Sequence, residues 1–143
     1  MTITNANIFS ESYSEFKSFL GKITDPRSRY KANWIHSSMP NINQKGFDGY
    51  PFIILKVNVG EDKFALDTRV SSRIFRVLIS IWSPESTEVD TISDSLLNNL
   101  KTETNLTEFD IVTMDSSPLD WDLDKNGKKI LFRSINLIAR KRL

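Results

Sequence analysis

The sequence contains no cysteine and only one histidine in 143 residues. The lack of cysteine excludes disulfides, Cys-ligated zinc, iron–sulfur clusters and thiol nucleophiles, and it leaves the cellular compartment open. The five glycines stand at scattered positions (21, 46, 49, 60 and 127), so the chain has no glycine-rich loop that could cradle a phosphate. These absences predict a protein that is not an enzyme and that holds no metal and no cofactor.

Long apolar runs and an excess of charge of one sign are also missing. No stretch approaches the roughly eighteen apolar residues of a membrane span, and residues 1–9 lack the basic and apolar segments of a signal peptide. Nineteen Lys and Arg against eighteen Asp and Glu give a formal charge of +1, which provides no global reason to bind nucleic acid or an anionic membrane. We expect a soluble protein with residues 1–143 in a single domain.

The stretch Arg73–Trp82 predicts a long central strand, because β-branched and aromatic residues follow one another there without Gly or Pro. Its odd positions from Phe75 to Ile81 are wholly apolar, whereas Arg76 and Ser80 interrupt the apolar row of its even positions. We expect the odd side to face the core. The even side, which carries Trp82, should make a partly polar contact within the chain or between subunits.

The N-terminal part of the chain predicts one helix and two irregular segments. Ser12 opens the S-x-x-E spacing of a capping box, and apolar residues at helical spacing follow it. This pattern predicts a helix over about 12–22, after an extended arm at 1–11. Residues 27–50 show no period and predict a long loop, with room for a short strand near Trp34.

Downstream of that loop, apolar runs predict strands that pair mainly antiparallel. A strand at Pro51–Val59 is followed by a turn at Gly60–Asp62, and the chain then leads into the central strand. Ser83 and Pro84 predict a helix N-terminus with Ser83 as the cap, and an amphipathic helix over about 84–101 follows. One face of this helix should pack on the sheet.

The C-terminal part predicts a further strand and a terminal hairpin. The strand covers Thr107–Met114, and an acidic segment, Ser116–Asp124, follows it. Asn126-Gly127 is a strong signal for a type I′ hairpin turn before a last strand at Lys128–Arg140. The predicted fold is therefore α+β, a mainly antiparallel sheet packed by an N-terminal helix and one amphipathic helix, with a C-terminal β-hairpin.

One acidic motif resembles the opening of a calcium-binding loop. Asp120, Asp122 and Asp124 alternate as in an EF-hand. However, Lys125 stands where that loop requires glycine, and Leu131 stands where it requires a bidentate acid. An acidic, solvated strand that leads into the hairpin is the better interpretation.

The single histidine gives no support for a catalytic site. His36 is followed by Ser37 and Ser38, but no oxyanion glycine motif surrounds them. Carboxylate pairs such as Asp120 and Asp122 stand at turn-like places, where acids are normally only solvated. An enzyme would need a pocket that combines His36 with carboxylates, so a loop histidine is the preferred interpretation.

Basic residues gather at the two longest apolar strands, and their role stays open at this point. They either protect strand edges and form ion pairs, or they face partner subunits or passing DNA. The two groups are Arg69, Arg73 and Arg76, and Arg133, Arg140, Lys141 and Arg142.

The order of predicted elements resembles the tail-terminator (tail-completion) proteins of tailed bacteriophages. The most specific parts of the resemblance are Gly49–Phe52, which opens a strand, and Phe75–Ser83, which leads into a helix with an acidic first turn. Ile92–Leu97 adds to them. The resemblance covers most of the chain in element order and length.

That resemblance implies a structural virion protein at the head–tail (neck) junction, assembled in the host cytoplasm. It implies a ring, a homohexamer in this family, that caps the tail tube, stops its polymerisation and joins it to head–tail connector proteins. DNA would pass through the ring without specific binding. The candidate residues for contacts between subunits or with partners are Trp34, Phe47, Tyr50, Arg69, Arg73, Arg76, Trp82, Trp121, Arg140 and Arg142.

Two alternatives remain open on the sequence. Within the same assembly, the chain could be a head-closure or neck connector protein that contacts the portal side. From a different class, it could be a small cellular ligand-binding module with a groove lined by Trp34, Trp82 and Trp121.

Overall fold

The structure is a computed structural model that describes residues 8–21, 34–40, 49–64, 70–101, 109–124 and 126–142. Helices and strands alternate irregularly along these residues. They are α1 Ile8–Leu20, β1 Ile35–His36, β2 Phe52–Phe64, β3 Val70–Ser83, α2 Ser86–Lys101, β4 Asp110–Ser116, β5 Asp120–Leu123 and β6 Lys129–Arg142. The predicted α+β class is confirmed.

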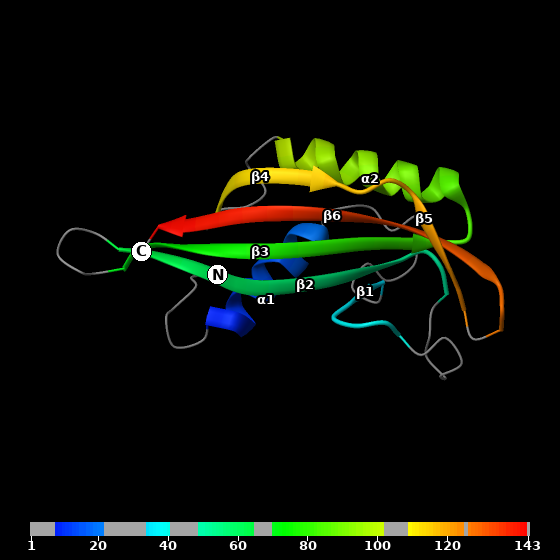
Figure 1. Cartoon of the computed structure of the whole chain (residues 1–143), viewed down its shortest axis with the longest axis horizontal. Helices are drawn as coiled ribbons and strands as arrows, with labels where there is room; N and C mark the ends of the chain where they lie inside the picture. The colour runs from blue at the N-terminus through cyan, green and yellow to red at the C-terminus, as the bar shows by residue number, and fades with distance from the viewer. Residues whose placement is uncertain are drawn as a thin grey trace.

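β3 lies in the middle of a six-stranded sheet with the order β1-β2-β3-β6-β4, and β5 pairs with the first part of β6 (Figure 1). β3 pairs antiparallel with β2 on one side and with β6 on the other. β1 is parallel to β2, with Ile35 opposite Ile53. The central strand and the short strand near Trp34 are therefore both present, and the sheet is mainly antiparallel as predicted.

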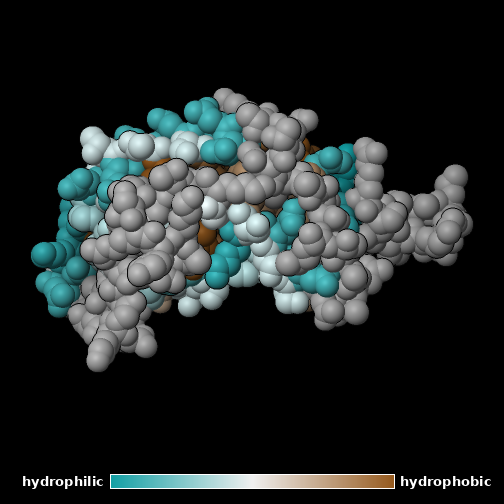
Figure 2. Space-filling view, turned by 180° about the vertical axis from the view of Figure 1, so that it is seen from behind, coloured by the Kyte–Doolittle hydropathy of each residue, from teal (hydrophilic) through white to brown (hydrophobic). Residues whose placement is uncertain are grey.

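Both helices pack on the same face of the sheet, the face formed by the odd positions of β3. Phe75 and Ile79 are fully buried there. The helices contribute Phe16, Phe19 and Leu20 from α1 and Val89, Ile92, Leu96 and Leu100 from α2. Burying each such side chain stabilises the fold by about 1.5–3 kcal/mol. Seen from this side, the apolar residues that are visible lie in small recesses (Figure 2).

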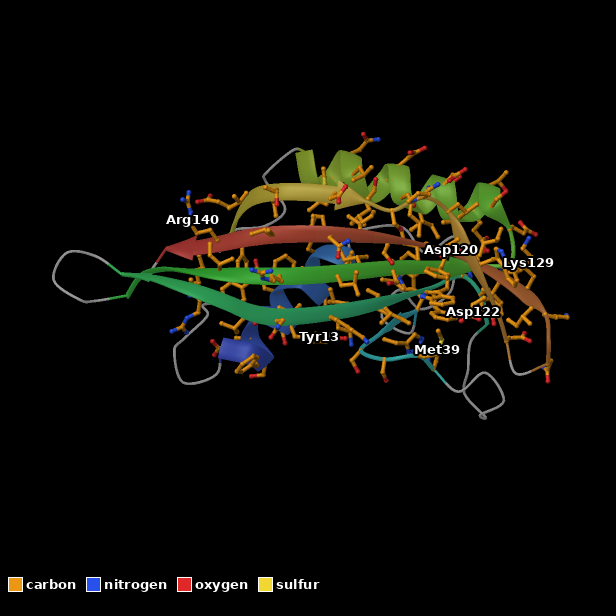
Figure 3. All side chains as sticks on the ribbon, viewed as in Figure 1. Tyr13, Met39, Asp120, Asp122, Lys129 and Arg140 are labelled. Atoms are coloured by element: carbon orange, nitrogen blue, oxygen red, sulfur yellow. The ribbon has the colours of Figure 1, made fainter. Side chains whose placement is uncertain are left out.

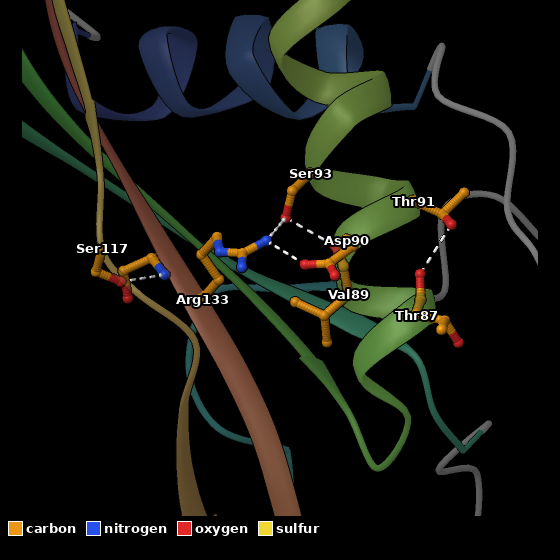
Figure 4. A network of polar contacts seen from close by, with 8 residues as sticks. Thr87, Val89, Asp90, Thr91, Ser93, Ser117 and Arg133 are labelled. Atoms are coloured by element: carbon orange, nitrogen blue, oxygen red, sulfur yellow. Dashed lines mark hydrogen bonds and ion pairs between the residues drawn. The ribbon is translucent and has the colours of Figure 1, made fainter.

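A polar network fixes α2 to β6 at the border of this core (Figure 4). The Arg133 guanidinium forms an ion pair with Asp90 at 2.6 Å and approaches the Ser93 hydroxyl at 3.5 Å. The Ser93 hydroxyl in turn donates to the Val89 carbonyl. Arg133 lies opposite Ile81 in the strand register, on the side of the sheet that faces the helices. It stands in the place of an apolar residue, at the point where α2 presents the acidic Asp90.

α1 begins earlier than the sequence predicts. Ser12 lies inside the helix, is buried, and its hydroxyl donates back to the Phe9 carbonyl at 3.2 Å. A hydroxyl used in this way cannot cap the helix, so the capping-box prediction is wrong. The extended arm predicted for 1–11 is wrong for residues 8–11, which are helical, while residues 1–7 lie outside the described residues. The helix ends where the Gly21 N–H donates to the Lys17 carbonyl.

α2 begins two residues later than predicted. Ser83 still belongs to β3, where it pairs with Leu131, so it cannot be the residue that starts the helix. The Glu85 carbonyl accepts the hydrogen bond from the Val89 N–H and so holds the cap position. Ser83 nevertheless supports this helix end, because its hydroxyl accepts from the Glu85 N–H and donates to the Glu88 carboxylate at 2.6 Å.

β2 does not turn at Gly60–Asp62. It continues to Phe64, with a register shift between Val59 and Asp62, so the predicted turn is wrong. A β-bulge accommodates an extra residue while the ladder continues, and glycine is well suited to such a place. The residues between Phe64 and Val70 lie outside the described part of the chain.

The C-terminal hairpin is confirmed, although its turn differs from the predicted one. The Gly127 N–H donates to the Asp124 carbonyl at 3.0 Å, so the β-turn covers Asp124–Gly127 and is not centred on Asn126-Gly127. Gly127 has a φ of 77° at the end of this turn, as in a type I turn with a bulge. The Asp124 carboxylate selects this form, because it accepts the N–H groups of Asn126 and Lys128, each at 2.8 Å.

Candidate interaction surface

The sheet face opposite the helices is the most informative surface of the chain. Figures 1 and 3 show the strands in front of α1, and neither α1 nor α2 lies over the strands on this side. Even positions of β3 point to this face, together with their register partners on β2 and β6. We call it the uncovered face.

An aromatic row occupies one end of the uncovered face. Phe52, Trp82 and Phe132 are cross-strand neighbours on β2, β3 and β6. Trp82 stacks on Phe132 with ring centroids 4.4 Å apart and on Phe52 at 6.1 Å, and Tyr50 stacks on the far side of Phe52 at 5.4 Å. His36 meets the Phe52 ring edge-on. Because Phe52 and Trp82 are buried, this row is a second small core and not an open binding surface.

The charge of the hairpin reaches this aromatic row. Burial of its ring and, as a smaller cause, the negative charge of Asp124 raise the pKa of Tyr50 above its ordinary value of 10.0. Asp124 lies in the turn between β5 and β6. The hairpin turn and the aromatic row therefore form one connected end of the molecule.

The middle of the uncovered face contains a shallow depression with a volume of about 310 Å³. Leu78 and Ile138, which are half-buried, give it apolar character. The exposed side chains around them are Lys56, Asn58, Arg76 and Asn136. Within the described part of the chain, no ion pair neutralises Lys56 or Arg76. We call this site, defined by these six residues, the central depression.

The far end of the uncovered face carries Arg140 on β6. Its guanidinium is 3.8 Å from the Asp110 carboxylate, and both side chains are substantially exposed, so this ion pair is weak. The Arg140 Nε atom is buried and finds no hydrogen-bond partner among the described residues. Arg140 therefore keeps unused donor capacity beside the central depression.

The β4–β5 edge differs in charge from the rest of the uncovered face. Between Phe109 and Asp124 the only charged residues are aspartates. Asp115, Asp120 and Asp122 are exposed and lie opposite Asn136, Phe132 and Ile130 of β6, which places them toward the uncovered face. Val112, Trp121 and Leu123 on the same edge expose more than half of their surface. We call Asp115, Asp120 and Asp122 the acidic edge.

The structure brings together only part of the predicted contact set. Tyr50, Arg76, Trp82 and Arg140 lie on the uncovered face. Trp121 lies on the β5 edge, beneath the Lys129 ammonium at 5.3 Å. Arg73 lies on the other side of β3, half-buried between Asp62 of β2 and Lys141 of β6 in register.

The remaining four predicted residues add no described side chain to this surface. Trp34 is fully buried in the helix-side core, so it cannot contact a partner of the folded chain. Phe47 and Arg69 lie outside the described residues, and of Arg142 only the backbone, in β6, is described. The groove predicted from Trp34, Trp82 and Trp121 is absent, because the three side chains lie in the helix-side core, in the aromatic row and at the exposed edge.

Sequence reasoning missed the partners that complete this surface. Lys56 and Asn136 flank Leu78 in the strand register, and that register depends on the β2 bulge and on which strands are neighbours. The sequence does show the acidic edge directly, as a sixteen-residue segment from Phe109 to Asp124 without Lys or Arg. The acidic segment was recognised in the sequence, but its position on the same face as the cationic side chains follows only from the order and register of the strands.

Two further properties bear on the class of site. Within the described residues, no group of three or more His, Asp or Glu side chains is placed to hold a metal ion. No helix in the described ranges has the length and apolar character needed to cross a membrane.

No protein-family model matches the chain, and a search of curated proteins found no match.

Proposed function

We propose that this protein is a tail terminator of a tailed bacteriophage, a structural virion subunit that forms a ring at the neck, caps the tail tube and joins it to head–tail connector proteins. The element order and the stretches Gly49–Phe52, Phe75–Ser83 and Ile92–Leu97 support this proposal through their resemblance to that family. The function is mechanical and depends on shape and contacts between subunits.

One observation supports the proposal most directly: both helices pack on the same face of the sheet, and neither of them lies over the other face. In the middle of that face, half-buried Leu78 and Ile138 stand among exposed polar and charged side chains. A mixed surface of this kind is typical of contacts between proteins, in which apolar and polar groups are interleaved. A ring subunit needs such a surface.

The charge distribution also gives DNA no strong site on the chain, which agrees with a ring that DNA passes through without specific binding. Lys56 and Arg76 are cations on the uncovered face, but the acidic edge lies on the same face and would repel a phosphate backbone. Affinity for DNA increases with the number of phosphates that cations neutralise. Two opposed charge patches on a chain with a net charge of +1 therefore favour weak, non-specific contact.

The test is to measure tail-tube length. The purified chain, added while the tail-tube protein from the same genome polymerises, should stop elongation and appear as a ring at one end of each tube in electron micrographs. A chain that leaves tube length unchanged but binds the purified portal or connector would instead be a neck connector. A chain that interacts with neither tubes nor connectors contradicts the proposal.

A further inference from the structure

The uncovered face contains two patches of opposite charge on one rigid sheet. The central depression provides Lys56 and Arg76, and the acidic edge provides Asp115, Asp120 and Asp122. The acids lie on β4 and β5 and the cations on β2 and β3, and β6 lies between the acidic and the cationic strands. Since all of them belong to the same sheet, the acidic edge of a chain cannot fold over to fill its own depression.

We infer that the central depression binds the acidic edge of a second copy of this chain. The depression combines an apolar floor, Leu78 and Ile138, with cations and the amide groups of Asn58 and Asn136. The acidic edge presents the exposed carboxylates of Asp115, Asp120 and Asp122, all on the same side of β4 and β5. The two surfaces therefore complement each other in charge, which favours specific docking.

The backbone of the acidic edge supports the same contact. β4 and β5 both pair with β6, and no other described strand pairs with them, so one side of each has no strand partner. Such an edge is available to another chain. Aspartates on both strands do not favour pairing between two identical edges, because the carboxylates would face each other. They favour docking against a cationic surface.

Charge also disfavours one of the possible symmetries. A two-fold contact centred on the depression would bring Lys56 and Arg76 of one copy toward the same cations of the other. The contact between depression and edge joins different surfaces, so successive copies can repeat it head-to-tail, which is a heterologous arrangement. Heterologous contacts close into rings when the rotation between copies allows it. This inference rests on the proposed ring-forming function and specifies which surfaces would form the ring.

Nucleic acid is the main competing occupant of a depression lined by Lys56 and Arg76. It is disfavoured because Asp115 lies opposite Asn136, on the strand next to the one that helps line the depression. A phosphate chain that crossed the depression would approach these carboxylates. The acidic edge of a second copy meets cations there and has no such conflict.

The decisive experiment uses two charge-reversal variants and their mixture. One variant carries Lys56→Glu with Arg76→Glu, and the other carries Asp120→Lys with Asp122→Lys. Each variant alone places like charges at the contact, so self-association measured by sedimentation should weaken at least about tenfold. In an equimolar mixture every contact is again between opposite charges, so association should recover. Recovery also shows that both variants are folded.

Several results would overturn the inference. One is a wild-type chain that stays monomeric at high concentration and low salt. Another is a charge-reversal variant that associates as strongly as wild type. A third is a mixture of the two variants in which association does not recover. Binding of a labelled DNA duplex that is lost in Lys56→Glu with Arg76→Glu, without any self-association of wild type, would assign the depression to nucleic acid instead.

The inference and the proposed function can fail separately. If reversal and recovery occur as expected but tail tubes keep growing, the contact exists and the tail-terminator function is wrong. If the chain caps tubes and both variants assemble normally, the function stands and the ring uses other surfaces.

Discussion

Trp82 on β3 and Phe132 on β6 stack with ring centroids 4.4 Å apart and an interplanar angle of 19°. They lie on the face that no described helix covers, yet Trp82 exposes only 9% of its surface. Aromatic pairs of this kind add about 0.5–1.5 kcal/mol beyond the burial of their area. The aromatic row therefore gives the uncovered face a rigid end beside the central depression.

The first prediction compares two tryptophans in opposite environments. Trp82→Ala should lower the free energy of unfolding by about 3 kcal/mol, because it removes a buried ring from the stack. Trp121→Ala is the matched control, since Trp121 is 54% exposed and contacts Lys129. It should cost at most about 1 kcal/mol. Urea unfolding measures both values, and equal losses would show that the aromatic row is not a core.

The second prediction concerns the start of α2. Ser83→Ala removes both the acceptor for the Glu85 N–H and the donor to the Glu88 carboxylate. We expect a loss of about 1 kcal/mol in the free energy of unfolding. Ser86→Ala, at the exposed first residue of the helix, is the control and should change stability little. Thermal unfolding followed by circular dichroism distinguishes the two outcomes.

The third prediction concerns the contact between α2 and β6. A double-mutant cycle with Asp90→Ala and Arg133→Ala should give a coupling energy of about 0.5 kcal/mol that decreases with added salt. The comparison cycle is Asp110→Ala with Arg140→Ala, whose charged atoms are 3.8 Å apart and more exposed. Its coupling should be smaller. A larger coupling in the second cycle would reverse our ranking of the two ion pairs.

The fourth prediction concerns two glycines with different backbones. Gly127→Ala should destabilise the hairpin by about 1 kcal/mol, because Gly127 has a φ of 77°. Gly21 has no positive φ, and an added Cβ there would meet only ordinary neighbours at 3.4 Å and 3.5 Å. Gly21→Ala should therefore be nearly neutral. Unfolding curves of the two variants test this difference directly.

The fifth prediction is a dependence of stability on pH. The folded state raises the pKa of Tyr50 above 10.0, so it favours the protonated phenol. The resulting stabilisation is complete below pH 10.0 and is lost as the pH rises through the higher folded pKa. Tyr50→Phe should reduce the loss of stability in this alkaline range. Asp124→Asn should make Tyr50 ionise earlier, which ultraviolet absorbance of the tyrosinate can follow.

The sequence predicts the central part of this fold well and its borders less well. The apolar odd positions from Phe75 to Ile81 correctly identify the core side of β3, because every second residue of a strand points to the same face. The helix N-termini predicted from Ser12 and Ser83 were wrong. In both cases a hydroxyl has several possible backbone partners, and tertiary packing decides which of them it bonds.

The candidate surface was harder to predict for a different reason. Arg76 and Trp82 could be identified from the alternation along one strand. Lys56 and Asn136 could not, because they join Arg76 only through the register of neighbouring strands. A one-residue shift in either pairing would move these side chains to the opposite face. Register is a property of the whole sheet, and local sequence does not determine it.

The place of β6 in the sheet has a consequence for folding during synthesis. β6 comes last among the described strands, yet it lies between β3 on one side and β4 and β5 on the other. Until the ribosome has made β6, β4 and β5 have no strand to bond, and one side of β3 is open. Closing these long-range pairings makes folding slow. The nascent chain therefore cannot complete its sheet, or present a finished acidic edge to a neighbour, before Lys129–Arg142 has left the ribosome.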